Sequence, residues 1–209
     1  MLYYAVKIVC SVAFGIAFSF RTEGRENIPD GESVIYASNH RTNADPPLVG
    51  CRAKGKFAFM AKEELFRNKL FCWLIKSLGA FPVSRGKGDT GVLDTAVERL
   101  ESGRSLVIFP EGTRSKDGKV HRGHSGAAVI AARSGKRIVP VGVVFGEKLK
   151  FRTRVTVKFG KPIDPKDYVD DANEPNPRQL VKLKNRYMEE IKLLVEGAPE
   201  NKDEAGEEK

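Results

Sequence analysis

The sequence predicts an α/β fold: a largely parallel mixed sheet flanked by helices, preceded by an apolar N-terminal membrane-associating helix. Short β-branched runs alternate with segments of helical periodicity along most of the chain, which is typical of such a sheet. The run SLVIF, residues 105–109, is apolar without interruption, as expected of a strand covered on both faces. Residues 2–20 are apolar apart from Lys7 and a few serines, which indicates the N-terminal helix.

The individual elements follow from the period of the apolar residues and from turn and cap signals. The expected strands are residues 33–37, 57–60, 80–83, 105–109, 138–144 and 154–159. The expected helices are residues 47–53, 62–78, 92–102, 124–134 and 178–195, two of them ended by Gly103 and Gly135. Functional groups in a parallel sheet lie on the loops that leave the carboxyl ends of the strands, so those loops are the place to look for a site.

The apolar leader allows three interpretations. As a helix, residues 2–20 would reach roughly 28 Å, close to the ~30 Å hydrocarbon core of a bilayer. The helix could lie in one leaflet, cross the membrane once, or be buried in the protein. Bulky Phe18 and Phe20 argue against signal-peptide cleavage. Arg21 and Arg25 favour the cytoplasmic side, so we expect a monotopic or single-span anchor on the cytoplasmic face of the cell membrane.

Composition indicates the domain boundaries and limits the classes of binding partner. We expect the membrane-associating helix over residues 1–22, one globular domain over 23–197 and an acidic, disordered tail over 198–209. The net charge of +9 favours phosphate-bearing partners. No nucleic-acid recognition motif accompanies that charge, so we expect no nucleic-acid partner. The 3 cysteines are widely spaced, which argues against a disulfide framework and a structural zinc site.

One loop, SNHRTNADPP, leaves the strand at residues 33–37 and carries a candidate catalytic pair. His40 and Asp45 would lie about 140° apart on a regular helix. Pro46 biases Asp45 out of the helical region, however, so a turn can bring the two side chains together. A carboxylate that accepts the Nδ1 proton of His40 would leave Nε2 free to act as a base. The alternative is that Asp45 only caps the following helix.

A second loop, FPEGTRS, leaves the strand at residues 105–109 and combines a carboxylate, a glycine, a hydroxyl and an arginine. Arg114 suits a phosphate because its guanidinium donates two parallel hydrogen bonds. Gly112 would allow backbone to approach a ligand closely. The alternative for this loop is a surface turn with solvated charges.

His121 and His124 form an HxxH pair beside this loop. A metal site would require at least one more ligand at a defined position, and the sequence offers none. We therefore expect no metal, and a solvated turn followed by a helix start at these residues.

Four blocks of the sequence resemble the conserved blocks of the HxxxxD glycerolipid acyltransferases. They occur in family order over about residues 30 to 145, and they are NHRTNADP at 39–46, GAFPVSRG at 79–86, FPEGTRS at 109–115 and IVPVGV at 138–143. Within this family the chain is most similar to the 1-acyl-sn-glycerol-3-phosphate (lysophosphatidate) acyltransferases. Its apolar leader is shorter than in members that have two leading helices.

The resemblance implies transfer of a fatty acyl group from acyl-coenzyme A or acyl carrier protein to the sn-2 hydroxyl of lysophosphatidic acid at a phospholipid membrane. The product would be phosphatidic acid for phospholipid biosynthesis, and no cofactor beyond the acyl thioester is implied. His40 and Asp45 would be catalytic. The expected substrate-binding residues are Arg85, Glu111, Gly112, Thr113 and Arg114, with Lys62 added from its AKEEL context.

Two other functions remain open at this point. A related acyltransferase could act on glycerol 3-phosphate or on another lysophospholipid, because acceptor preference depends on pocket shape. A non-catalytic lipid-binding protein is a more distant alternative. Such a protein would be expected to have lost His40 or Asp45, and the sequence retains both.

Overall fold

A computed structural model describes residues 2–83, 90–172 and 174–197. Its strands are β1 Ser19–Glu23, β2 Ile35–Ser38, β3 Phe57–Lys62, β4 Ala80–Val83, β5 Ser105–Ile108, β6 Ile138–Val144 and β7 Arg154–Phe159. Its α-helices are α1 Leu2–Ala17, α2 Asp45–Arg52, α3 Lys69–Ser77, α4 Thr90–Glu101, α5 Gly126–Ser134 and α6 Pro177–Glu196. Short 3-10 turns cover Arg25–Asn27, Glu63–Phe66 and Pro165–Asp167.

The strands form one mixed sheet in the order β1-β7-β6-β2-β5-β3-β4. Only the pairing of β6 with β7 is antiparallel among the described strand pairs. β2 lies in the middle and is buried along its whole length. The predicted α/β class with a largely parallel mixed sheet is therefore confirmed.

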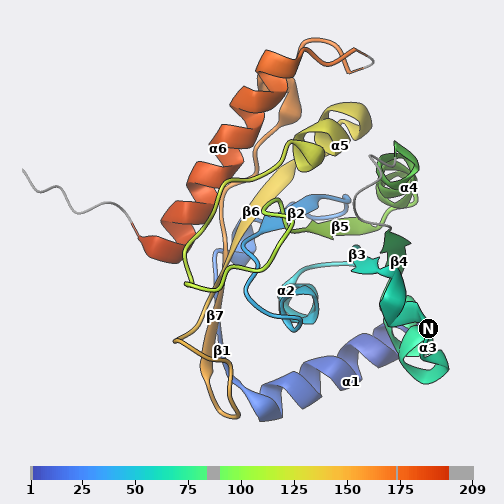
Figure 1. The fold of residues 1–209 in the computed structure, drawn as a ribbon, viewed down its shortest axis with the longest axis vertical. Coiled ribbons are helices and arrows are strands. Elements are labelled where there is room, and N and C mark those ends of the chain that lie inside the picture. The colour runs from blue at the N-terminus through green and yellow to red at the C-terminus, as the bar shows by residue number, and fades with distance from the viewer. Residues whose placement is uncertain (1, 84–89, 173, 198–209) are drawn as a thin grey trace, which may run out of the picture.

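Helices cover both faces of the sheet, with α1, α2 and α3 on one side and α4, α5 and α6 on the other (Figure 1). Alternate residues of β2 serve the two layers. Tyr36 packs in the layer of α1 and α2, whereas Ile35 and Ala37 pack beneath α5 and α6. This two-sided burial explains why the central strands are continuously apolar.

The N-terminal helix is shorter than the sequence predicts. α1 ends at Ala17, and residues from Ser19 form β1, which pairs in parallel with β7. The expected boundary at residue 22 therefore divides a strand of the sheet. No helix within the described residues is long and apolar enough to cross a membrane. The tail at 198–209 lies outside the described part of the chain.

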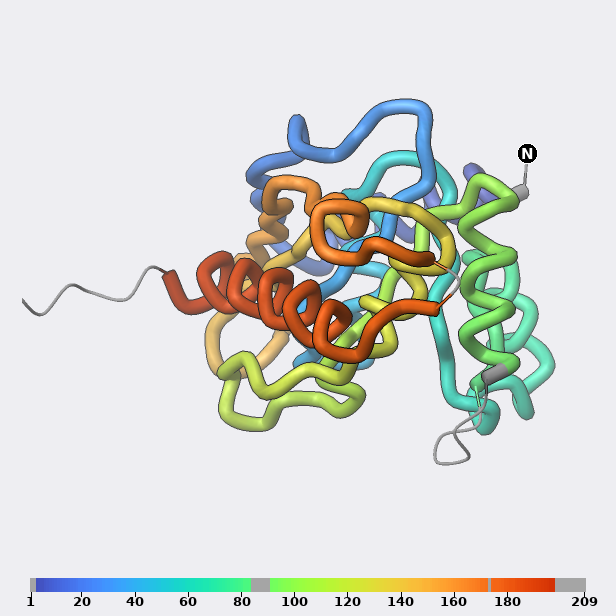
Figure 2. The backbone as a smooth tube through the Cα atoms, turned by 90° about the horizontal axis from the view of Figure 1, so that it is seen from above, coloured from blue at the N-terminus to red at the C-terminus, as the bar shows by residue number. Residues whose placement is uncertain are grey.

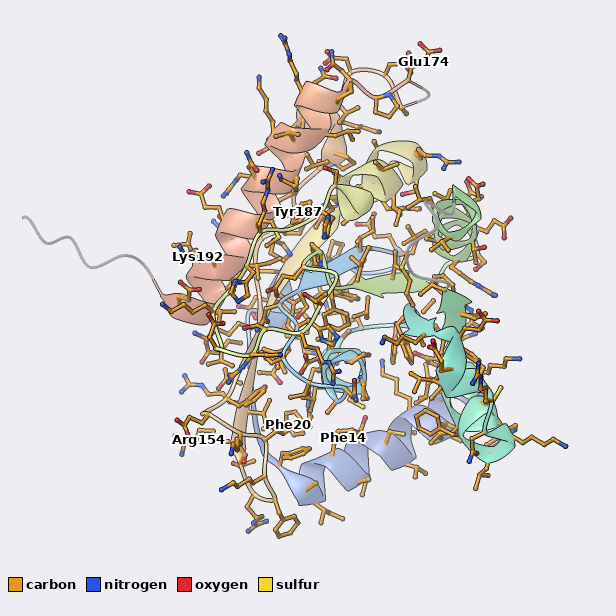
Figure 3. The ribbon with its side chains drawn as sticks, viewed as in Figure 1. Phe14, Phe20, Arg154, Glu174, Tyr187 and Lys192 are labelled. Atoms are coloured by element: carbon orange, nitrogen blue, oxygen red, sulfur yellow. The ribbon has the colours of Figure 1, made fainter. Side chains whose placement is uncertain are left out.

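One face of α1 packs against the domain. Tyr3 is buried and its hydroxyl accepts a hydrogen bond from the backbone N–H of Phe57 at 2.9 Å. Phe14, Phe18 and Phe20 pack against the same core, and Figure 3 shows Phe14 and Phe20 on the side of α1 that faces the sheet. The opposite face exposes Tyr4, Ile8, Val9, Val12 and Ile16.

Two of the predicted helices differ in their extent. The periodicity across 62–78 predicts one helix, but a 3-10 turn and α3 share this region. Asn68 separates them because its side chain accepts the N–H of Phe71 and so begins a new helix. The helix expected from residue 124 begins at Gly126.

The turn before β4 depends on a glycine. Gly79 has φ 92°, and a Cβ placed on it would lie 2.2 Å from the carbonyl oxygen of Phe57 in the neighbouring strand. We expect Gly79→Ala to lower the free energy of unfolding by about 3 kcal/mol or more, from strained φ plus backbone displacement. Urea denaturation measures this change.

Gly103→Ala is the matched control, because Gly103 also has positive φ (78°) but its added Cβ would meet nothing within 4 Å. This variant carries the conformational cost alone, about 1–2 kcal/mol. Equal destabilisation by both substitutions would show that the close approach of Gly79 to β3 contributes nothing.

Candidate active site

The site centres on a hydrogen bond between His40 and Asp45. Nδ1 of His40 lies 2.9 Å from Oδ2 of Asp45, at the carboxyl end of β2. The Asp45 side chain is 1% exposed and that of His40 is 11% exposed. A buried carboxylate facing Nδ1 favours the tautomer of His40 that carries the proton on Nδ1. Nε2 is then a hydrogen-bond acceptor. Nε2 has no hydrogen-bond partner within the described residues.

Asp45 does not cap α2. It is the first residue of the helix, and its carboxylate turns back to the preceding loop. Oδ2 accepts the N–H groups of Arg41 at 2.6 Å and Thr42 at 2.8 Å, while Oδ1 accepts the Thr42 hydroxyl at 2.8 Å. The interpretation of Asp45 as only a helix cap is thus wrong, and the predicted approach of Asp45 to His40 is confirmed.

Packing fixes the plane of the imidazole. The ring of His40 stacks on Phe109, with 4.1 Å between centroids and 23° between planes. Phe109 follows β5, which lies next to β2 in the sheet. The ring is therefore held by a hydrogen bond at one edge and by an aromatic face.

The loop that carries His40 is attached to β6 by the side chain of Asn39. Its Nδ2 donates to the carbonyl of Val143 at 3.0 Å, and its Oδ1 accepts the Val143 N–H at 2.7 Å. Asn39 is 3% exposed. These two hydrogen bonds continue the β2–β6 ladder through the side chain of Asn39. They fix the backbone immediately before His40.

Glu111 connects the two loops. Oε1 accepts the backbone N–H of His40 and Oε2 accepts the backbone N–H of His121, both at 3.0 Å. The backbone N–H of Ser115 donates to the carbonyl of His40 at 2.7 Å. Glu111 is 5% exposed, so these amides supply the hydrogen bonds that a buried carboxylate requires. Contact between Glu111 and a substrate stays a prediction.

Arg41 does not present its guanidinium to a ligand. It donates to the carbonyls of Phe145, Gly146 and Glu147 and lies over the Phe145 ring at 4.1 Å. This arginine therefore attaches the His40 loop to the segment after β6.

The other predicted binding residues differ in their surroundings. Arg114 and Thr113 are exposed on the loop after β5, and the Arg114 side chain has no partner within the described residues. Gly112 has φ 70°, and an added Cβ would lie 3.2 Å from Cδ2 of His124. Lys62 is exposed at the end of β3. Arg85 lies outside the described residues.

The HxxH residues are separately engaged. Nε2 of His121 lies 2.9 Å from Oδ1 of Asp117, and the ring of His124 lies against Gly112. Hydrogen bonds from the backbone N–H of Lys119 and from the Ser115 hydroxyl hold the pKa of Asp117 well below its usual range, at about 2. No group of three or more potential metal ligands occurs within the described residues.

A family model described as Acyltransferase matches residues 19–144, which include both loops and the strands that carry them. The chain belongs to this acyltransferase family. The match begins at β1 and ends with β6, so it contains the first six strands of the sheet.

Several known acyltransferases are similar to this chain. A 1-acyl-sn-glycerol-3-phosphate acyltransferase of Streptococcus pneumoniae is 37% identical over 82% of the chain and 64% of its own length, so the chain spans less than two thirds of that relative. An enzyme of the same name from Bacillus subtilis is 29% identical over 91% of the chain and 93% of its own length. The crystal structure of the 1-acyl-sn-glycerophosphate (LPA) acyltransferase PlsC from Thermotoga maritima has a TM-score of 0.73 at 27% identity, covering 95% of this chain and 80% of that one.

Sequence reasoning missed three residues that position the acyltransferase site: Asn39, Arg41 and Phe109. All three lie inside the recognised blocks, so the blocks contained the signal, but no role could be assigned to them. Their partners are on other strands, and the sequence alone does not show that β6 and β5 lie on either side of β2.

Replacement of Glu111 tests its positioning role. In Glu111→Gln one acceptor oxygen becomes an NH₂ group that faces a backbone N–H, so we expect the free energy of unfolding to fall by about 1–3 kcal/mol. We also expect kcat to fall by up to about 10²-fold, because a shift of His40 of roughly 1 Å can cost that much. The KM for the acceptor should change little.

Steady-state kinetics and urea denaturation measure both effects. Glu98→Gln is the control, because Glu98 is exposed on α4 and undergoes the same chemical change. A large rise in KM at unchanged kcat in Glu111→Gln would instead assign Glu111 to direct acceptor binding.

Proposed function

We propose that this acyltransferase moves a fatty acyl group from an acyl thioester to the sn-2 hydroxyl of 1-acylglycerol 3-phosphate, giving phosphatidic acid. The observation that carries the proposal is the hydrogen bond between His40 and the buried Asp45, with Nε2 of His40 unpaired among the described residues and the exposed Arg114 on the neighbouring loop. Support also comes from the relatives, whose names give acyl transfer with 1-acyl-sn-glycerol 3-phosphate as the acceptor.

The mechanism is general base catalysis. Nε2 of His40 accepts the proton of the acceptor hydroxyl while the hydroxyl oxygen attacks the thioester carbonyl. The C–O bond forms, the C–S bond breaks, and the imidazolium returns the proton to the leaving thiolate. Asp45 stabilises the imidazolium and keeps the ring oriented. The acyl group passes directly from donor to acceptor, without an acyl-enzyme.

The acceptor phosphate requires cations near this base. Arg114 follows β5, and its loop is hydrogen-bonded to His40 through Ser115, which supports a position of its guanidinium at the same edge of the sheet. Lys62 ends β3, which pairs with β5, and adds a second cation along that edge. A phosphomonoester bound there would place its glycerol toward His40.

We further propose that α1 lies in the interfacial region of the cytoplasmic leaflet of the cell membrane. Its outward face exposes Tyr4, Ile8, Val9, Val12 and Ile16, with no charged residue among them. An apolar helix face of this kind binds at the boundary between headgroups and acyl chains. Both lipid substrates partition into the bilayer, so an enzyme that acts on them benefits from this position. Coenzyme A and acyl carrier protein are both suitable carriers of the donor.

His40→Ala tests the proposed base. We expect turnover to fall by at least about 10²–10⁴-fold, the usual contribution of a positioned base. Transfer of a labelled acyl group to lysophosphatidic acid measures turnover, and thermal unfolding checks the fold. His121→Ala serves as the control because His121 is exposed and its ring is hydrogen-bonded to Asp117 rather than to Asp45. Appreciable turnover in His40→Ala would exclude this residue as the base.

Arg114→Ala tests recognition of the phosphate. Loss of a charge-assisted hydrogen bond costs about 1.5–3 kcal/mol, so we expect the KM for lysophosphatidic acid to rise roughly 10- to 100-fold. The KM for the acyl donor should stay nearly constant. Arg122→Ala, an exposed arginine of the same loop, is the matched control.

The same assay with a panel of acceptors separates the proposal from its rival. Lysophosphatidic acid should be preferred over glycerol 3-phosphate and over neutral lysolipids. Preference for another acceptor would keep the acyltransferase chemistry and reject the proposed substrate. An equal loss toward donor and acceptor in Arg114→Ala would contradict the role of this residue.

A further inference from the structure

A groove lies between α1, the C-terminal end of α2 and the loop over residues 25–31. Its volume is about 680 Å³. Lys7, Arg25 and Lys54 supply its cationic groups, and Ile8 and Val12 supply apolar side chains along one wall. The groove is therefore amphiphilic in its lining.

The groove is distinct from the proposed active site. Residues 25–31 precede β2, and Lys54 precedes β3, whereas His40 follows β2. In Figure 2 the blue loop around residue 30 and the yellow-green loop over residues 110–124 lie on opposite sides of the molecule. α2 runs from the loop that bears His40 to the groove, and its 8 residues span roughly 12 Å.

The charges in the groove are only partly neutralised. Asp30 pairs with Lys54 at 2.8 Å. Lys7 donates to the carbonyls of Ala53 and Gly55 at 2.9 Å, which leaves its third N–H without a partner within the described residues. Burial and the positive charge of Arg25 lower the pKa of Lys7.

Arg25 is exposed, and its side chain has no partner in the described part of the chain. Three cations therefore face one carboxylate in this groove. A bound anion would satisfy the open donors and relieve the repulsion between Lys7 and Arg25.

The apolar wall is continuous with the outward face of α1. Ile8 is 62% exposed and Val12 is 57% exposed, and both also belong to the face proposed to contact the membrane. A ligand in the groove would thus meet cations at one end and the acyl region of a bilayer at the other.

We propose that this groove is a second, non-catalytic site that binds the phosphate headgroup of an anionic glycerophospholipid. Lys7, Arg25 and Lys54 hold the phosphate, and the acyl chains leave the groove along Ile8 and Val12 into the leaflet. The site rests on the proposed orientation of α1 at the membrane. It would fix the rotation of the helix on the bilayer, so that the edge bearing His40 keeps a constant height above the lipid.

A phosphate ester in solution shares the headgroup chemistry but not the apolar part. Away from a membrane, the wall formed by Ile8 and Val12 would remain in water if inorganic phosphate occupied the groove. Burial of these side chains against acyl chains contributes free energy that only a lipid supplies. This difference favours the lipid as the occupant.

The test measures sedimentation of the full chain with phosphatidylcholine vesicles, with and without phosphatidylglycerol. Each cation near an anionic surface contributes about fivefold to partitioning. We expect Arg25→Gln with Lys54→Gln to lower the partition coefficient on phosphatidylglycerol vesicles by about 25-fold. On pure phosphatidylcholine the same variant should bind as the unchanged chain does.

Two control pairs remove the same charge elsewhere. Arg178→Gln with Lys182→Gln lies on α6, on the other side of the sheet, and should change partitioning by less than about twofold. Lys69→Gln with Lys76→Gln lies on α3, which contacts α1. A loss as large in the α3 pair as in the groove pair would show diffuse attraction and overturn the proposal.

Alkylation of Cys51, which lines the groove, gives a local readout. Mass spectrometry would follow the modification rate of each thiol in turn. Phosphatidylglycerol vesicles should slow the reaction of Cys51 more than phosphatidylcholine vesicles do, and Arg25→Gln with Lys54→Gln should abolish the difference. The same rate on both kinds of vesicle in the unchanged chain would refute headgroup binding in the groove.

Inorganic phosphate without vesicles distinguishes the two sources of the anion. If phosphate alone protects Cys51 as well as the lipid does, the groove is a site for a small soluble anion and the lipid assignment is wrong. Should the double variant fail to fold, Arg25→Gln alone is informative, because the Arg25 side chain has no partner to lose among the residues that the structure describes. A fivefold loss is expected of it, and no loss would reject the site.

Failure of the proposed function is visible separately. Turnover of a water-soluble short-chain lysophosphatidic acid needs no vesicle, so the groove variants should match the unchanged chain in that assay. Normal vesicle binding with no turnover would leave the groove in place and reject the acyltransferase reaction. A turnover defect in the groove variants on this soluble substrate would reject a non-catalytic role.

Discussion

The carboxylate of Asp45 is buried and accepts four hydrogen bonds, from the ring of His40, the backbone of Arg41 and both the backbone and hydroxyl of Thr42. Burial of a charge is costly unless hydrogen bonds replace its hydration. Here the replacement comes entirely from the loop that precedes α2. The loop must therefore fold around the carboxylate, and this requirement sets the direction of the imidazole.

The polar residues around this carboxylate fall into two groups: those that position the site and those that remain available to a substrate. Asn39, Glu111 and Arg41 are all polar, yet the hydrogen bonds of their side chains go to backbone groups, apart from a long one from the Ser38 hydroxyl to Asn39 at 3.5 Å. They hold two loops and the segment after β6 in a fixed relation. His40 and Arg114 have unused hydrogen-bonding capacity among the described residues of these two loops. These are the two groups that we propose act on the substrates. A site in which most polar groups serve positioning is well suited to transition-state stabilisation, which depends on preorganised groups.

The sequence predicted what local pattern controls. Pro46 next to Asp45 indicated a turn, and five residues were enough for the carboxylate to return to His40. The contacts between distant segments could not be predicted in this way. Asn39 and Val143 are 104 residues apart, and their pairing follows from the order of strands in the sheet, which a single sequence does not display.

The N-terminal region shows a second reason for an incorrect prediction. Phe18 and Phe20 are apolar like the helix before them, so hydrophobicity gave no boundary. The helix ends before residue 19 because residues 19–23 form β1, which pairs with β7. The helix 62–78 failed for the opposite reason. Its cap signal, Asn68, was present in the sequence, but the apolar period continued across it and masked the break.

α1 is connected through α2 to the loop that holds His40. α2 packs between α1 and the sheet, with Asp45 at one end and Arg52 at the other. Residues of α1 and α2 share one core with β2, so we expect a rotation of α1 to shift α2 and the loop that holds His40. Arg52 is over the Phe20 ring at 4.0 Å, which ties the far end of α2 to β1. If α1 lies at the membrane surface as we propose, its depth would therefore also set the height of His40, the proposed base.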